Sequence, residues 1–376
     1  MNLFNFIIYL DRLMPNLKSV LNKNVFFKKL FVCLLPLLAL FLIKPSIAAP
    51  IQKLNATGAG SSFAAPIFSQ WAADFQQATK TEINYQATGS SAGYRQLLEK
   101  TIDFAASDKP ISAEDIQSKQ LVQFPAIVGG VVVIINIDGV KSNQLVLSGP
   151  VLEGIYTGKI KKWNAPEITA INPNLNLPNR SIAVVKRADG SGTTYLFTHY
   201  LSKFSQKTAN EQSIQPSADA NLMVGIGGKG NQGVATSVQK IPNSIGYVEY
   251  AYAKTGHLIV TNLINSEKQI VSPNLESFAS AAAHADWSTS EGQILTNQAG
   301  SQTWPIVGAT FVVMPKHHIQ ANKSIATLKF FKWAFANGYN SAKNLDYVML
   351  PKAVIENLYR QVWPEIVDEK NQSVQY

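Results

Sequence analysis

The chain has 376 residues, a formal net charge of +9 and a single cysteine. Residues 1–48 contain six basic residues and one acidic residue, so residues 49–376 carry a net charge of only +4. This is unlike the dense basic face of a nucleic-acid-binding protein, and we expect no nucleic-acid partner. Because Cys33 also lies in the first 48 residues, the remaining chain has no thiol for a disulfide, and burial must stabilise it.

Residues 1–48 have the pattern of a cleaved secretory signal peptide. Lysines precede an apolar run over residues 30–43, and Ser46 and Ala48 are the small residues that signal peptidase requires. The run is shorter than the roughly 20 apolar residues of a membrane-spanning helix. We therefore expect cleavage after Ala48 and export of the protein. A retained membrane anchor is the alternative, and Met14 is an alternative start of the chain.

Beyond residue 50, short β-branched runs alternate with helical patterns, which is typical of an α/β fold. Strands are predicted at residues 81–85, 131–135, 182–185 and 310–313. Helices are predicted around residues 67–75, 94–98 and 197–204, because apolar side chains recur there every three or four positions. We find no internal repeat in the sequence.

Two segments that combine proline with an extended apolar run, residues 125–130 and 304–307, are predicted to cross between domains. If both cross, residues 49–128 and 305–376 form one lobe, called lobe I here. Residues 129–304 then form lobe II. The length agrees with this division, since a domain typically has about 100 to 200 residues.

Glycine and hydroxyl residues open three of the helical patterns, at residues 58–63, 89–93 and 189–193. Each loop is a candidate anion site, because a helix N-terminus has unpaired N–H groups and a partial positive charge. Each is also an ordinary capping sequence. The third loop is more specific, because Arg187 precedes it and guanidinium binds oxyanions through paired hydrogen bonds. Asp189 is placed to hold Arg187, with a surface ion pair as the alternative.

Asp108, which follows an apolar stretch, adds information about the ligand. An ionised carboxylate repels a bare oxyanion, but it accepts a hydrogen bond from an anion that carries a proton. Phosphate retains a proton near neutral pH, whereas sulfate retains none. Asp108 therefore favours phosphate, and a turn or capping role is the alternative.

Eight ordered strings closely resemble the periplasmic phosphate-binding protein of high-affinity phosphate ABC transporters. They are residues 57–60, 84–86, 89–91, 103–104, 106–108, 187–193, 227–231 and 245–254, and they extend through most of residues 49–376. The resemblance implies an α/β, two-lobed periplasmic binding protein fold (type II). Each lobe would be a mixed β-sheet flanked by helices, and crossover strands would join the lobes.

The resemblance also implies what the protein does. We expect a monomer in the periplasm that binds inorganic phosphate and delivers it to the permease subunits of an ABC importer. We expect no enzymatic activity, no cofactor and no metal. Carried over by position, the phosphate contacts are Ser62, Ser90, Asp108, Arg187, Ser191, Thr193 and the backbone N–H groups of Phe63 and Gly192, with Asp189 orienting Arg187.

The first loop departs from the family in one respect. It commonly reads Ala-Thr-Phe, whereas here it reads Ser61-Ser62-Phe63. Serine keeps the hydroxyl of threonine but loses its methyl group and some restriction of χ1. We expect the specificity to be unchanged.

Other functions fit parts of the sequence. A serine hydrolase is the strongest alternative, because residues 89–93 read G-x-S-x-G with Ser91 as the nucleophile, and His284 or the pair at 317–318 would have to supply the base. A nucleotide-binding loop fails, because Gly230 follows Lys229 where a hydroxyl is required. A surface protein that scavenges phosphate without a transporter stays open, and neighbouring permease genes would argue against it.

Overall fold

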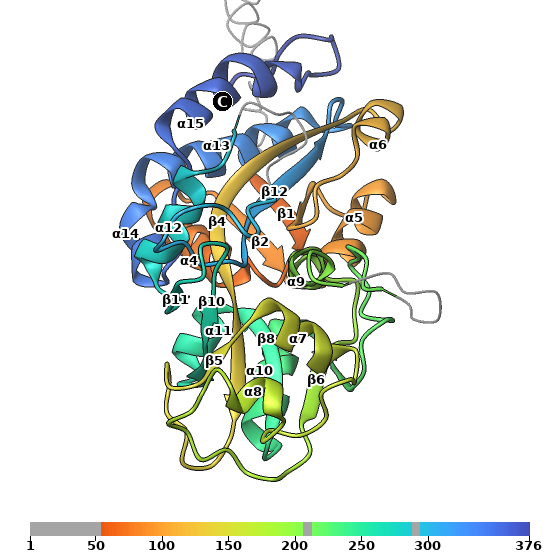
Figure 1. Cartoon of the computed structure of the whole chain (residues 1–376). Helices are drawn as coiled ribbons and strands as arrows, with labels where there is room; N and C mark the ends of the chain where they lie inside the picture. The colour runs from red at the N-terminus through yellow and green to blue at the C-terminus, as the bar shows by residue number, and fades with distance from the viewer. Residues whose placement is uncertain (1–53, 206–212, 288–293) are drawn as a thin grey trace, which may run out of the picture. The chain divides into compact units, whose positions relative to one another are not determined.

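The computed structural model describes residues 54–205, 213–287 and 294–376 (Figure 1). The predicted signal peptide, residues 1–48, and the alternative start at Met14 lie outside the described residues. None of the helices in the described ranges combines the length and apolar character that crossing a membrane requires.

The elements of the described residues follow in chain order. The strands are β1 (Asn55–Gly60), β2 (Glu82–Gln86), β3 (Phe104–Ser107), β4 (Leu121–Asn136), β5 (Val146–Leu147), β6 (Ala183–Arg187), β7 (Ile226–Gly228), β8 (Ser244–Glu249), β9 (Ile259–Val260), β10 (Asn262–Ile264), β11 (Ile270–Val271) and β12 (Val307–Pro315). The helices are α4 (Ala65–Thr79), α5 (Ser90–Leu98), α6 (Ala113–Ser118), α7 (Gly149–Tyr156), α8 (Pro166–Thr169), α9 (Gly192–Ser202), α10 (Gly230–Lys240), α11 (Tyr250–Thr255), α12 (Leu275–Ala283), α13 (Ala321–Asn337), α14 (Tyr339–Asn344) and α15 (Lys352–Asn357). A π-helical segment, η1 (Leu358–Val362), and a 3₁₀ turn, η2 (Trp363–Glu365), follow α15.

The predicted strands and helices are confirmed. The four predicted strands lie in β2, β4, β6 and β12, and the three predicted helices are α4, α5 and α9. Strand β4 is much longer than predicted, because residues 125–130, predicted as a separate crossing segment, belong to the same strand. Pro125 is tolerated there because the register with β12 shifts between Thr310 and Phe311, and proline is found at such bulges.

The long strand β4 holds the main sheet together (Figure 1). Within the described residues this sheet has nine strands in the order β2-β1-β3-β12-β4-β8-β6-β7, and β9 also pairs with β4. Residues 121–130 of β4 pair with β12, and residues 131–136 pair with β8. Parallel pairs (β1 with β2 and β3, and β6 with β7 and β8) occur on both sides of β4, together with antiparallel pairs. A smaller sheet has the order β11-β10-β5.

Aromatic side chains fill the core between β1, β3, β4 and helices α4 and α13. Phe331 of α13 is fully buried, and its ring packs edge-on against three other rings. Its ring centroid lies 5.4 Å from that of Phe68 and 5.6 Å from those of Phe104 and Phe124. Such pairs add about 0.5 to 1.5 kcal/mol each to the free energy gained by burial.

Replacing Phe331 should therefore destabilise the whole domain. We expect Phe331→Ala to lower the free energy of unfolding by about 3 to 5 kcal/mol, because the truncated side chain leaves a cavity among the three rings. Urea unfolding followed by tryptophan fluorescence measures this loss. The control is Ile226→Ala, at a side chain that is 50% exposed on β7, where we expect a change within about 0.5 kcal/mol. Equal losses in the two variants would contradict this account of the core.

Candidate functional site

The predicted site residues follow the carboxyl ends of parallel strands. Ser62 and Phe63 follow β1, Asp108 follows β3, and Arg187 is the last residue of β6. Ser90 begins helix α5, shortly after β2 ends. In α/β sheets ligands bind outside the carboxyl ends of the strands. The topology therefore brings residues from distant parts of the sequence to one place.

The carbonyl groups of the first loop are held by three tyrosines. Each hydroxyl donates to a successive carbonyl oxygen and comes from a different element. The pairs are Tyr85 to Ser61 at 2.7 Å, Tyr252 to Ser62 at 2.7 Å and Tyr347 to Phe63 at 2.5 Å. Because these carbonyls are bonded on one side, the peptide planes of the loop have a fixed orientation.

Asp108 is the buried carboxylate of the site, with only 1% of its surface exposed. Its Oδ1 accepts hydrogen bonds from Ser61 Oγ at 2.6 Å and from Thr310 Oγ1 at 2.7 Å. Its Oδ2 is buried and has no hydrogen-bond partner among the described residues. Burial raises the pKa of Asp108 to about 6, although both hydroxyl donors and the nearby charge of Arg187 act to lower it.

Ser61 also bonds to the backbone of its own loop. Phe63 N, a predicted phosphate contact, donates to Ser61 Oγ at 3.0 Å, and Ala64 N approaches the same atom at 3.4 Å. Ser61 Oγ therefore accepts from backbone N–H groups and donates its hydrogen to Asp108.

Arg187 is held by Asp189 in a two-point ion pair. Arg187 Nε and Nη2 donate to the two carboxylate oxygens of Asp189 at 2.8 and 2.5 Å, and Gly230 N donates to Asp189 Oδ1 at 3.0 Å. Burial acts to raise the pKa of Asp189, but Arg187 and the backbone donors outweigh it, so this pKa lies below its ordinary value. Arg187 Nη1 is buried without a hydrogen-bond partner among the described residues.

The third predicted loop forms the N-terminus of helix α9. Ser191 is its N-cap and accepts from Thr194 N at 3.0 Å, and Gly192 N donates to Ser90 Oγ at 3.1 Å. A Cβ atom at Gly192 would lie 2.5 Å from Asp108 Oδ2, so only glycine lets the helix start approach the carboxylate. Thr193, also predicted, is 1% exposed in the first turn of α9.

Several polar residues of the site were missed by the sequence analysis. They are Ser61, Thr310, Asn231 and the three tyrosines. Asn231, Tyr85 and Tyr252 lie inside strings that carry the family resemblance, and Ser61 lies in the first helix-opening loop; these positions were the available signal. Thr310 lies in a buried strand, and nothing in the sequence separates Tyr347 from ordinary core aromatics.

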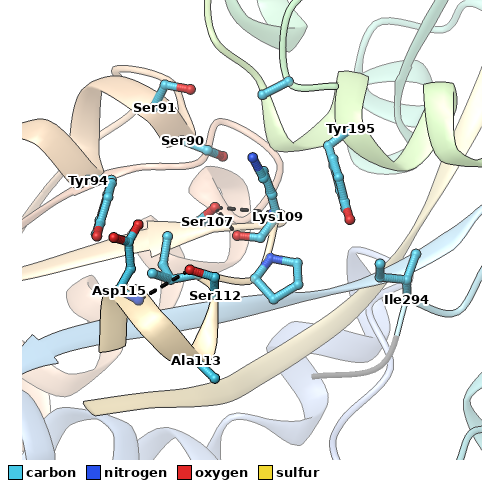
Figure 2. A pocket seen from close by; sticks show the side chains of 13 residues that line it. Ser90, Ser91, Tyr94, Ser107, Lys109, Ser112, Ala113, Asp115, Tyr195 and Ile294 are labelled. Carbon is cyan, nitrogen blue, oxygen red and sulfur yellow. Dashed lines mark hydrogen bonds between the residues drawn. The ribbon is translucent and has the colours of Figure 1, made fainter. Parts of the chain in front are cut away.

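A cavity of about 490 Å³ lies beside this site, between α5, α9 and the segment before α6 (Figure 2). Ser90, Ser91, Lys109 and Tyr195 are among its lining residues, and Lys109 Nζ lies 5.7 Å from the centre of the Tyr195 ring. No histidine is among the lining residues that the structure describes. The candidate bases for Ser91 lie elsewhere: His317 and His318 line another cavity, and His284 Nδ1 lies 2.8 Å from the Ser280 carbonyl oxygen.

Comparisons with known proteins show the family to which this chain belongs. Residues 48–337 match the model of the PBP superfamily domain. The phosphate-binding protein PstS of Haemophilus influenzae is 45% identical over 315 residues, which cover 83% of this chain and 94% of the relative. The chain belongs to the PstS phosphate-binding protein family. PstS of Pasteurella multocida is 46% identical over 85% of this chain and 93% of its own length.

Solved structures show the same fold. A high-affinity periplasmic phosphate-binding protein, solved with phosphate at pH 8.5, superposes with a TM-score of 0.66 at 19% identity, over 81% of this chain and 93% of that chain. The phosphate-binding protein from Stenotrophomonas maltophilia gives a TM-score of 0.62 at 20% identity, over 82% and 93%. The predicted fold class, a two-lobed periplasmic binding protein fold with mixed sheets and flanking helices, is confirmed.

The raised pKa of Asp108 predicts how stability depends on pH. Because the folded protein binds this proton more tightly than the unfolded chain, the stabilisation is complete below the unfolded pKa of about 3.9 and is lost as the pH rises through about 6. Asp108→Asn lacks this titration. Between pH 4 and 7 we expect the variant to gain up to about 3 kcal/mol of unfolding free energy relative to the wild type. Urea unfolding without phosphate or sulfate measures the difference.

The matched control lies at the other end of β3. Hydrogen bonds and charge from His318, Thr57 and Lys323 outweigh burial at Asp103 and lower its pKa. Its contribution is therefore present above the unfolded pKa and is lost as the pH falls. Measured from about pH 5 down through the unfolded pKa of about 3.9, Asp103→Asn should gain unfolding free energy relative to the wild type as the pH falls, opposite in sign to Asp108→Asn, and parallel trends would contradict the account of Asp108.

Proposed function

We propose that this protein binds inorganic phosphate in the periplasm with high affinity and delivers it to the permease subunits of a phosphate ABC importer. It acts as a binding protein and not as an enzyme. The relatives at 45 to 46% identity are named phosphate-binding proteins, and their similarity extends over 83 to 85% of this chain. The buried polar groups described above support the same ligand.

One observation carries the proposal. Asp108 Oδ2 can only accept a hydrogen bond when ionised, and Arg187 Nη1 can only donate, yet both are buried without partners among the described residues. Unpaired groups of this kind are costly, and a ligand that offers both an acidic proton and an anionic oxygen satisfies them together. Protonated phosphate has both groups, whereas sulfate has only the oxygens.

The remaining contacts complete the shell of donors. We assign them to the hydroxyls of Ser62, Ser90, Ser191 and Thr193 and to the N–H groups of Phe63 and Gly192. In this structure Phe63 N bonds to Ser61, and Gly192 N bonds to Ser90. Phosphate would replace these two bonds by charge-assisted ones worth about 1.5 to 3 kcal/mol each. Micromolar binding needs only about 8 kcal/mol in total, so the site has energy to offset ordering.

The division into lobes belongs to the same proposal. Strand β4 changes its partner from β12 to β8 between Gly130 and Val131, close to the predicted boundary between residues 128 and 129. Ser62, Ser90 and Asp108 then belong to lobe I, whereas Arg187 to Thr193 belong to lobe II. Phosphate would lie between the lobes. Since one chain supplies every contact, we propose that a monomer is sufficient.

Titration calorimetry of residues 49–376 with phosphate tests the function directly. We expect a Kd at or below about 1 µM for phosphate and no measurable heat with sulfate, because sulfate offers no proton to Asp108. Absence of heat with phosphate would end the proposal. Comparable affinities for both anions would leave a general oxyanion-binding protein instead.

Asp108→Asn tests the role of the carboxylate in selectivity. The amide can donate to an oxyanion, so we expect the preference for phosphate over sulfate to fall by at least about tenfold, which is 1.4 kcal/mol. The measurement is the ratio of the two dissociation constants, and Asp103→Asn is the control that leaves the ratio unchanged. An unchanged ratio in Asp108→Asn would remove this residue from discrimination.

A further inference from the structure

Asn231 is a fully buried polar residue in the first turn of α10, and the function proposed above gives it no contact with the ligand. It makes four hydrogen bonds. Its Nδ2 donates to Ser62 Oγ at 2.9 Å and to Thr193 Oγ1 at 3.2 Å, its backbone N donates to Ser62 Oγ at 3.2 Å, and its Oδ1 accepts from Glu249 N at 2.9 Å. Two of its partners are proposed phosphate contacts.

The orientation of the Asn231 amide is determined by the backbone. Glu249 N is a peptide N–H group, which can only donate, so the amide atom facing it must be the oxygen. The NH₂ group therefore faces Ser62 and Thr193. Because NH₂ is only a donor, both hydroxyl oxygens must accept from it.

This arrangement leaves the Ser62 hydroxyl with one remaining hydrogen-bonding capacity, which is to donate. A serine hydroxyl has two lone pairs and one hydrogen. Both lone pairs of Ser62 Oγ are used, one by Asn231 N and the other by Asn231 Nδ2. The hydroxyl can then only donate its hydrogen. Thr193 Oγ1 has one lone pair occupied by the same amide, which biases it in the same direction.

We propose that Asn231 is a positioning residue for specificity, which makes the Ser62 hydroxyl an obligatory donor to the bound anion. This inference rests on the proposed function. With both lone pairs occupied, the Ser62 hydroxyl cannot accept a hydrogen bond from the ligand's proton. That proton is then directed to Asp108 Oδ2, whose other oxygen already accepts from Ser61 and Thr310.

The contact between Asn231 and Ser62 joins two segments that are distant in the sequence. The Ser62 hydroxyl is restricted to donating only when these segments meet. Ser62 lies in the loop after β1, and Asn231 lies in the helix after β7, at the opposite edge of the main sheet's strand order. The Ser62 hydroxyl is therefore restricted to donating only when the loop after β1 contacts α10. Tyr252, whose hydroxyl holds the Ser62 carbonyl, comes from α11 and reinforces the same approach.

A double-mutant cycle with Ser62 tests the proposal. In calorimetry with phosphate, we expect Asn231→Ala to weaken binding at least about tenfold in the wild-type background. In a Ser62→Ala background the same change should weaken binding less than about threefold, because the hydroxyl that Asn231 holds on both lone pairs is gone and only the longer bond to Thr193, at 3.2 Å, is left. A purely structural role would give the same loss in both backgrounds, and that result would overturn the proposal.

Asn172 supplies a matched control. It is also a buried asparagine with its amide fully bonded, to Val146 and Ile168, but it lies outside the site. Asn172→Ala should lower the melting temperature while phosphate affinity stays within about twofold, since distant sites act independently. An affinity loss equal to that of Asn231→Ala would overturn the proposal.

A second variant tests the proposal in case Asn231→Ala does not fold. Asn231→Asp keeps the acceptor for Glu249 N but replaces the donor facing Ser62 by an acceptor, which draws the hydroxyl hydrogen away from the ligand. We expect phosphate binding to fall at least about a hundredfold. Wild-type affinity in this variant would overturn the inference and leave the proposed function intact. Failure of the wild-type protein to bind phosphate would overturn both.

Discussion

The site depends on one constraint, which is that a charged group removed from water must be paired. Arg187 and Asp108 are at most 3% exposed, and leaving either without partners is costly. Asp189 bonds to two of the three guanidinium nitrogens, and two hydroxyls donate to one oxygen of Asp108. What is left over is one donor nitrogen and one acceptor oxygen. In the proposed function, recognition of the ligand therefore follows from the incomplete pairing of two buried charges.

In the proposed function, selectivity then comes from the number of hydrogen-bond donors and acceptors, because the net charge of the site's side chains is small. Arg187 is opposed by both Asp189 and Asp108, so bulk attraction for an anion is weak. The hydroxyls are not interchangeable in this count. Ser61 and Thr310 give their hydrogens to Asp108, whereas Ser62 receives two bonds from Asn231 and has only its hydrogen left. A neighbour that can only donate, or only accept, a hydrogen bond determines whether an adjacent hydroxyl accepts or donates.

The sequence predicts the parts of this site that are local. The helix-opening loops, Arg187 and Asp108 could be identified because a few adjacent residues carry their chemistry. Thr310 could not, since its role depends on strand register: β12 pairs antiparallel with β3 so that Phe311 opposes Ser107, which brings Thr310 next to Asp108. Asn231 and the tyrosines depend likewise on which segments the fold brings together. Register and packing are tertiary properties that no short pattern contains.

Pro125, Gly129 and Gly130 of β4 predicted a crossing between domains in the sequence, and in the structure they determine the local geometry of this strand. Where Thr310 pairs with Ile127 and Phe311 with Pro125, one residue of β4 is extra, and such a bulge bends a strand and increases its twist. A Cβ at Gly129 would meet the ring of Phe63 at 2.8 Å, and one at Gly130 would meet that of Phe278 at 2.3 Å. The absence of side chains there lets the first site loop pack directly on β4. The strand shared by both halves of the sheet thus also supports the loop that presents Ser62 to Asn231.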